Sequence, residues 1–194
     1  MNVQSAPFTI EFWMYLTGAN TNRMILANSQ FDGEGFFMTI NRSCCGASNN
    51  TLDLAKSGKD DQYSSVYAPG FAQNIWYHIA AVQNFSGGIP SYVQFFVNGQ
   101  SQGTYSSTTN FNSSTGRSKG ISRAYADMSN FQGNLDEVRI WNVALTQTEI
   151  RDNMCQKLTG SEAGLVGYWR FDETSGTTAY DSQTNVPPNN GTLK

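Results

Sequence analysis

The segment Phe8–Leu16 carries an apolar side chain at every second residue, and this pattern constrains the fold more than any other feature of the chain. A period of two places the alternate side chains on one face of an extended strand. The segment therefore predicts a β-strand with one face in a hydrophobic core. The core-facing residues would be Phe8, Ile10, Phe12, Met14 and Leu16.

Similar patterns recur along the chain. Asn98-Gly99 lies between two β-rich runs, and both residues tolerate positive φ, which favours a tight hairpin. In the run Gly164–Phe171, the side chains of Leu165, Trp169 and Phe171 are expected on one face of the strand. Further strands are expected at Arg23–Ala27, Gly35–Ile40, Thr51–Ala55, Ile75–Phe85, Tyr92–Val97, Gln100–Tyr105, Phe131–Asn142 and Gly164–Phe171.

The apolar phase slips inside the Phe131–Asn142 run. Leu135 should face the core, and so should Val138 and Ile140, which an uninterrupted alternation does not allow. A β-bulge at Asp136-Glu137 restores the phase, because a bulge adds one residue to one strand of a pair. We therefore expect an irregular backbone next to two carboxylates.

One helix is expected. Thr146-Gln147-Thr148-Glu149 is a capping box, in which the Thr hydroxyl and the Glu carboxylate each accept from an unpaired backbone N–H group. The helix should run through Ile150 and Met154 to about Lys157. About a dozen short strands with a single helix indicate an all-β fold, a two-layer antiparallel β-sandwich of the jelly-roll type. Its 194 residues suffice for one core, so we expect a single domain over 1–194.

The charge excludes some classes of partner. The net charge is −3 and only 14% of residues are charged, so the chain has no basic surface for nucleic acid. No apolar run approaches the roughly 20 residues of a membrane helix, so no membrane insertion is expected. No secretory signal follows Met1, and we favour an excised extracellular or cell-surface module with an added Met, next to neighbouring domains of a larger polypeptide.

Cysteine and histidine are scarce. Cys155 can pair with Cys44 or with Cys45, these two neighbours can bridge each other, or all three thiols can be free. His78 is the only histidine. It shares a strand face with Trp76, which indicates a histidine of the core rather than a catalytic base.

Five segments together resemble the laminin-G-like jelly roll of the concanavalin A-like lectin/glucanase superfamily, whose relatives include pentraxins and legume lectins. Their order and spacing cover nearly the whole chain. The segments are Phe8–Met14, Trp76–Val82, Phe95–Gly99, Phe131–Ile150 and Gly164–Thr178. Family members place a Phe-Asp-Gly-type strand before the first segment, and this chain starts too late to include it. We expect the C-terminal segment 164–194 to close the sandwich instead; origin from a tandem array is the alternative.

The resemblance implies a calcium ion near the sandwich rim and a surface that binds a glycan or a cell-surface protein. Calcium takes six to eight oxygen ligands. Asp136, Asp172 and Asp181 are candidates for a composite site, although the regular acidic calcium-loop pattern is absent. The alternative is that Asp136 caps a turn and that the other two stabilise Asx-turns.

Two polar loops are further candidates. Asp60 and Asp61 would hold calcium beside Tyr63 and Tyr67, which would stack on a sugar. A second loop offers an arginine, a tyrosine and an aspartate for ligand binding, namely Arg123, Tyr125 and Asp127. All four tryptophans are assigned to the core or to a second layer, which leaves them out of the expected ligand site.

Three functions are considered. The first is a non-catalytic lectin-like module that binds a glycan through rim loops with calcium. The second is an adhesion or spacer module without a small ligand. The third, a glycoside hydrolase, is disfavoured: such enzymes need two carboxylates on one face, whereas Asp136 and Glu137 are adjacent and should point to opposite faces.

Overall fold

The computed structural model describes residues 6–18, 23–27, 36–40, 51–56, 63–67, 71–106, 120–121 and 129–193. One helix, α1 (Gln147–Met154), accompanies the strands. The strands are β1 (Phe8–Leu16), β2 (Arg23–Ala27), β3 (Phe36–Ile40), β4 (Thr51–Lys56), β5 (Tyr63–Tyr67), β6 (Trp76–Ser86), β7 (Ile89–Val97), β8 (Gln100–Ser106), β9 (Gly120–Ile121), β10 (Ser129–Asn130), β11 (Gly133–Trp141), β12 (Leu165–Trp169), β13 (Thr178–Ala179) and β14 (Gly191–Thr192).

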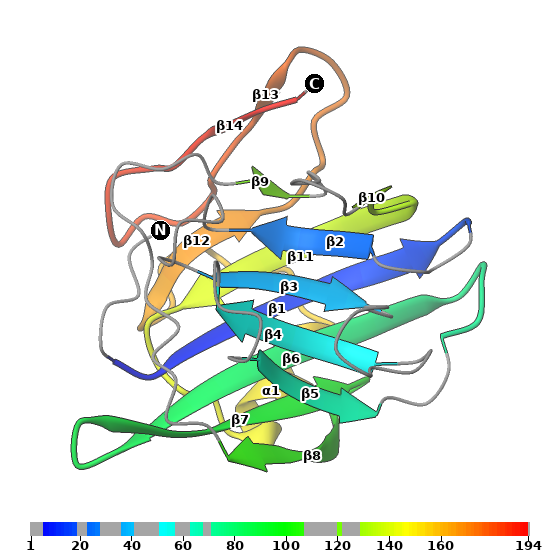
Figure 1. The fold of residues 1–194 in the computed structure, drawn as a ribbon. Coiled ribbons are helices and arrows are strands. Elements are labelled where there is room, and N and C mark those ends of the chain that lie inside the picture. Colours follow the sequence, from blue (N-terminus) through cyan, green and yellow to red (C-terminus); the bar gives the residue numbers. More distant parts are fainter. Residues whose placement is uncertain are drawn as a thin grey trace.

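Two large sheets face each other (Figure 1). The six-stranded sheet has the order β12-β11-β1-β6-β7-β8, and the five-stranded sheet has the order β10-β2-β3-β4-β5, with β9 also paired to β2. The pairs are antiparallel apart from β10 and β2. This arrangement confirms the predicted all-β sandwich.

The alternation in β1 is confirmed. The side chains of Phe8, Ile10, Phe12, Met14 and Leu16 are at most 1% exposed and lie in the core between the sheets. Met38 and Leu52 of the opposite sheet belong to the same cluster. Burial of such side chains stabilises the fold by roughly 1.5 to 3 kcal/mol each, so this strand anchors the sandwich.

Helix α1 covers the outer face of the six-stranded sheet, which adds a third layer on that side (Figure 1). Ile150 of the helix packs with Val82, Phe96 and Trp141 of the sheet. The predicted capping box between Thr146 and Glu149 is present. The helix ends at Met154 rather than near Lys157, because Gln156 turns back, its backbone N–H donating to Asn153 O and its side chain to Asp152 O.

The Asn98-Gly99 hairpin between β7 and β8 is confirmed, with φ of 48° and 68°. It also positions the helix, because Gln147 Nε2 and Arg151 Nε donate to Gly99 O at 2.8 and 2.9 Å. A Cβ at Gly99 would lie 2.7 Å from Arg151 Cγ, so glycine is required for both the turn and the approach of the helix.

Several expectations are wrong in detail. Tyr63, expected in a loop, begins the unpredicted strand β5. Leu165 and Trp169 do not share a face. Leu165 packs with Ile150 of α1 in the hydrophobic cluster under the helix (the helix-side cluster), and Trp169 packs in the core between the sheets. The cause is an irregularity in the β11–β12 ladder, where Ile140 pairs with Gly167 but Trp141 pairs with Leu165. The extra residue reverses the alternation.

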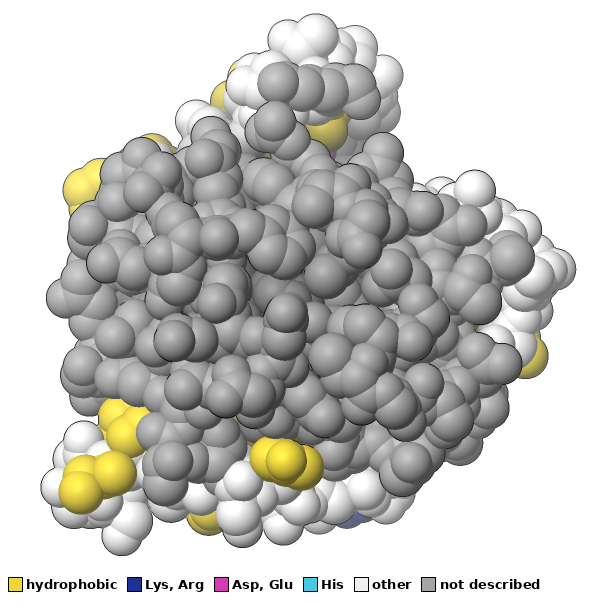
Figure 2. All heavy atoms as spheres, in the orientation of Figure 1, with side chains coloured by type: hydrophobic (Ala, Val, Ile, Leu, Met, Phe, Trp, Pro, Cys, Tyr) yellow, Lys and Arg dark blue, Asp and Glu magenta, His cyan; other side chains and the backbone are white. Residues whose placement is uncertain are grey.

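The described residues also place some hydrophobic side chains on the surface. On the face seen in Figure 2, the described hydrophobic side chains form separate small groups. Scattered apolar side chains of this kind are normal on proteins. Within the described part of the chain, no helix has the length and the hydropathy needed to cross a bilayer.

Candidate functional site

The predicted bulge at Asp136-Glu137 is confirmed. Along the β1–β11 ladder, Glu11 pairs with Arg139 but Trp13 pairs with Asp136, and Glu137 has a φ of 50°. The bulge also changes the direction of the two acidic side chains. Asp136 and Glu137 line the same groove, whereas adjacent residues of a regular strand point to opposite faces.

The groove has a volume of about 440 Å³ and lies where α1 ends over the six-stranded sheet. One wall is aromatic, one is acidic, and the third is the chain that follows the helix. The lining residues are Trp13, Trp76, Asp136, Glu137, Met154, Cys155, Gln156 and Lys157. This combination of aromatic surface and polar groups is typical of sites for small polar ligands.

Trp76 supplies the exposed aromatic surface. Its side chain is 40% exposed, and its ring lies 5.4 Å from that of Tyr15. Trp13 is more buried, and its Nε1 donates to Met154 O at 2.8 Å, which ties the end of α1 to the sheet. The assignment of all four tryptophans to the interior is therefore wrong for Trp76, although Trp141 and Trp169 are buried. Trp76 is the first residue of β6, and it does not belong to the helix-side cluster.

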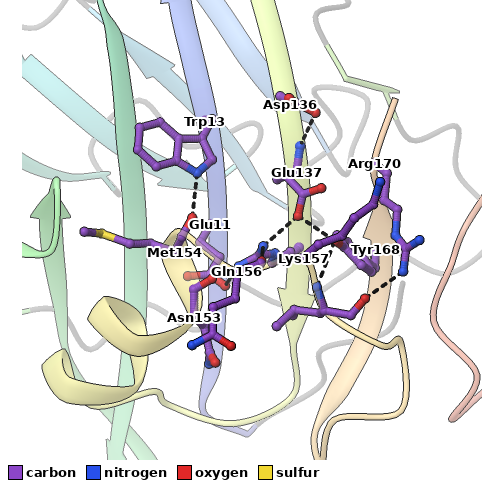
Figure 3. A network of polar contacts seen from close by, with 12 residues as sticks. Glu11, Trp13, Asp136, Glu137, Asn153, Met154, Gln156, Lys157, Tyr168 and Arg170 are labelled. Carbon is purple, nitrogen blue, oxygen red and sulfur yellow. Dashed lines mark hydrogen bonds and ion pairs between the residues drawn. The ribbon is translucent and has the colours of Figure 1, made fainter. Parts of the chain in front are cut away.

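A buried ionic network supports the acidic wall (Figure 3). At its centre is Arg139, which is 1% exposed. Its guanidinium donates to Glu137 Oε2 at 2.6 Å, and to the carbonyls of Asn153 and Gln156 at 2.9 and 2.6 Å. Arg139 thus connects the bulge to the segment that follows α1, and it holds two walls of the groove together.

Glu11 lies beneath this arginine and is fully buried. Its Oε1 accepts from Arg139 at 3.4 Å and from Trp141 Nε1 at 3.1 Å. Its Oε2 lies 3.5 Å from His78 Nε2 and accepts no hydrogen bond from the described residues. His78 is 1% exposed, which confirms its assignment to the interior.

Tyr168 closes the network on the β12 side. Its hydroxyl donates to Glu137 Oε2 at 2.5 Å, and Arg139 lies 5.4 Å from the centre of its ring. Burial, followed by the hydrogen bond to Glu137, raises the pKa of Tyr168, so the phenol remains protonated and serves as a donor. Glu137 is thereby held by two donors on one oxygen.

Asp136 is the less constrained acid of the groove. It accepts from the backbone N–H of the next residue, Glu137, at 2.9 Å. Burial is the largest cause of a raised pKa of Asp136, and the negative charges of Glu137 and Asp172 add to it. Lys157, the groove's lysine, forms an ion pair with Asp172.

The predicted calcium ligands do not converge in the described residues. Asp181 is buried, and both its carboxylate oxygens accept from protein donors, namely the backbone N–H groups of Tyr168, Gln183 and Asn189 and the Gln183 side chain. Asp172 pairs with Lys157. In the part of the chain that the structure describes, no group of three or more His, Cys, Asp or Glu side chains is placed to hold a metal ion. Asp172 and Asp181 thus have protein partners in this structure, and calcium binding stays a prediction.

Other predicted residues are only partly placed. Tyr63 and Tyr67 are the first and last residues of β5. Cys155 is a free, exposed cysteine at the groove. The other predicted residues lie outside the described residues, namely Asp60, Asp61, Arg123, Tyr125 and Asp127, together with Cys44 and Cys45.

Comparison with known proteins gives a family and a set of similar structures. The family model described as concanavalin A-like lectin/glucanases superfamily matches residues 1–151. No curated protein matches the chain significantly in sequence. A Bacteroides ovatus ATCC 8483 protein, for which carbohydrate binding has been inferred, is 21% identical with a TM-score of 0.74; the match covers 100% of this chain and 55% of that one.

Two further structures are similar over most of this chain. Domain 4 of an extracellular GH43 arabinanase from Geobacillus stearothermophilus, in complex with arabinotriose, is 18% identical with a TM-score of 0.56, covering 78% of this chain and 66% of that one. The CBM40 of a Ruminococcus gnavus IT-sialidase is 13% identical with a TM-score of 0.57, covering 77% and 83%. At these identities the likeness concerns the fold. The chain spans about half the length of the Bacteroides protein.

Proposed function

Because the chain belongs to the concanavalin A-like lectin/glucanase superfamily, we propose that it is a non-catalytic carbohydrate-binding module that holds its glycan in the groove beside α1. The observation that carries this proposal is that the exposed Trp76 and the carboxylate of Asp136 line one groove. A sugar presents C–H groups on one face and hydroxyls around its edge. An aromatic ring suits the first and a carboxylate suits the second.

The fold of the two carbohydrate-related neighbours supports this choice over a spacer role. Both the arabinanase domain and the CBM40 share the sandwich, and their names connect them to sugars. A module of this kind acts on glycans outside the cell or on its surface, so we propose an extracellular location beside other domains of a larger polypeptide.

Glycan binding by the full chain tests the proposal. The chain is labelled and applied to a glycan array, and the hits are measured by calorimetry with wild type and Trp76→Ala. We expect Trp76→Ala to weaken binding at least about tenfold, since stacking aromatics dominate such small contacts. Tyr105→Ala is the matched control, because Tyr105 is also 40% exposed but lies on β8, outside the groove lining. An array without hits, with and without calcium, contradicts the proposal and leaves the spacer role.

Calcium remains a prediction, and among the residues predicted to hold it, Asp60 and Asp61 lie outside the described residues. A ligand that binds only the folded state raises its stability. If these residues hold calcium, the melting temperature rises between chelator and millimolar calcium. An unchanged melting temperature excludes a structural ion.

A hydrolase is tested separately, since Asp136 and Glu137 line one groove. Glu137 is engaged by Arg139 and Tyr168, which argues for a structural carboxylate. We expect no reducing sugar to be released from β-glucans. Release that disappears in Glu137→Gln would overturn the non-catalytic assignment.

A further inference from the structure

The groove contains several charged side chains, and their pairing decides which sugars it accepts. Lys157 is the cation among the lining residues, and Asp172 neutralises it. Glu137 is neutralised by Arg139 at 2.6 Å. Among the charged residues of the lining, Asp136 has no ion pair in the described part of the chain. The groove therefore carries one uncompensated negative charge.

The nearest arginine is not available to a ligand. Arg139 is 1% exposed, and its terminal nitrogens already donate to Glu11, Glu137 and the carbonyls of the post-helix segment. Recognition of a carboxylate or sulfate requires an accessible cation, usually the fork of an arginine. Lys157 is the cation of the described lining and its side chain is 57% exposed, but its ammonium group is paired with Asp172, so an anionic sugar would have to displace Asp172 and would still face the charge of Asp136.

Asp136 has capacity for a neutral ligand. The one hydrogen bond that it accepts in the described structure comes from the Glu137 backbone N–H to Oδ1. An ionised carboxylate offers about four acceptor positions on its two oxygens. Sugar hydroxyls, or the ammonium group of an amino sugar, can donate to the positions that remain.

We propose that the groove is selective for saccharides without acidic groups, with Asp136 as the residue that accepts their hydroxyl or ammonium donors and repels carboxylates and sulfates. This inference depends on the proposed function, because it assigns the ligand class of the same groove. Specificity of this type comes from an unfavourable term against the wrong ligand as well as from contacts with the right one.

The test compares three classes of oligosaccharide on the array and by calorimetry: neutral galactan oligomers and N-acetylated chitooligosaccharides, deacetylated chitosan oligomers, and the acidic oligogalacturonides and sialyllactose. We expect hits among the first two classes and none in the third. For the hits, Asp136→Asn should reduce affinity for deacetylated chitosan more than for neutral sugars, because only the ammonium gains from the negative charge.

Two substitutions should each make the groove less negative. Asp136→Asn removes its negative charge, and Asp172→Asn frees the cation of Lys157. Each should strengthen binding of oligogalacturonide relative to galactan on the order of tenfold at low salt, since charges about 6 Å apart in a half-solvated site interact by that amount. High salt should reduce the change. Asp152→Asn, an exposed acid of α1 outside the groove lining, is the control and should change nothing.

The outcomes separate this inference from the proposed function. Wild-type binding of oligogalacturonide or sialyllactose that Trp76→Ala abolishes would overturn the selectivity and keep the groove as the glycan site. Binding of neutral sugars that Asp136→Asn leaves unchanged, without any gain for acidic ones, would also overturn it. No binding in any class overturns both.

Discussion

Glu11 and Asp181 are both buried carboxylates, and the structure holds them in different ways. Glu11 depends on charged and aromatic side chains, with Arg139 at 3.4 Å and Trp141 at 3.1 Å, and within the described part of the chain its Oε2 accepts no hydrogen bond. Asp181 depends mainly on the backbone: the N–H groups of Tyr168 and Asn189 donate to it at 2.8 and 2.9 Å. The first carboxylate lies under the groove, and the second fixes the C-terminal tail against β12.

The two carboxylates support different parts of the molecule. Backbone N–H groups are fixed by the chain, so Asp181 defines one conformation of the segment around it. The partners of Glu11 are side chains that also serve Glu137 and the carbonyls behind α1. A change at Glu11 is therefore expected to reach the groove, whereas a change at Asp181 should remain in the tail.

The largest effect is expected from Glu11→Gln. It leaves Arg139 buried with Glu137 as its remaining acidic partner, so we expect a loss at the lower end of the about 3 to 5 kcal/mol that breaking a buried ion pair costs. The measurement is the free energy of unfolding in urea. The double variant Glu11→Leu/Arg139→Met should not recover the loss, because it also removes the cation of Glu137 and the donor to the carbonyls of Asn153 and Gln156. A loss below about 1 kcal/mol for Glu11→Gln would show that the pair is not coupled to stability.

Asp181→Ala comes next. It removes the acceptor from the backbone N–H groups that fix the tail, and we expect a loss of about 2 to 3 kcal/mol. Hydrogen exchange gives the sharper result: amides of residues 182–193 should exchange faster, while those of β1 and β6 keep their protection. Equal acceleration throughout the molecule would contradict a local role.

Thr146→Ala tests how strongly α1 depends on its N-cap. The carbonyl of Asn153 in this helix accepts a hydrogen bond from Arg139. Loss of an N-cap costs about 1 kcal/mol. Hydrogen bonds from the backbone and side chain of Thr146 lower the pKa of Glu149 in the folded protein. The cap therefore stabilises the fold above the unfolded pKa of Glu149 and loses that contribution as pH falls through the lower folded pKa. The deficit of Thr146→Ala should shrink in acid; a deficit independent of pH would exclude the Glu149 contribution.

Asp136→Asn should have the smallest effect on the free energy of unfolding, and it should stabilise the protein rather than destabilise it. Burial raises the pKa of Asp136, so its charged form is disfavoured by folding at pH 7. Removing the charge should stabilise the protein by at most about 0.5 kcal/mol, the range of substitutions on half-exposed surface. As pH falls through the raised pKa, wild type protonates and the advantage disappears. A gain that persists at pH 3 would point to a cause other than the charge.

Periodicity predicted much of the fold. The strands β1, β2, β6 and β7, the hairpin at Asn98-Gly99 and the capping box are visible in sequence because each depends on a local pattern. The bulge at Asp136-Glu137 was also predictable, since only an extra residue reconciles Leu135 with Val138. Strand β5 was not, because the segment Tyr63–Tyr67 has no marked apolar alternation and pairs through its backbone with β4.

The groove was less accessible from sequence. Asp136 was predicted as a calcium ligand and lines the groove that we propose for a glycan, and Trp76 was assigned to the interior because it matches a position that packs inside in the resembled family. Its exposure depends on where α1 ends, which is a tertiary property. Glu11 and Arg139 were a missed signal: two opposite charges inside strands of otherwise apolar character indicate a buried pair.

Cys155 offers a direct way to observe the groove. Its thiol is free, exposed and among the lining residues, which also include Trp76. After serine replaces Cys44 and Cys45, a maleimide dye can be attached at this one position. Indole quenches many dyes on contact, so a sugar that inserts between the dye and Trp76 would raise the emission. The molecule would then function as its own fluorescent sensor of occupancy.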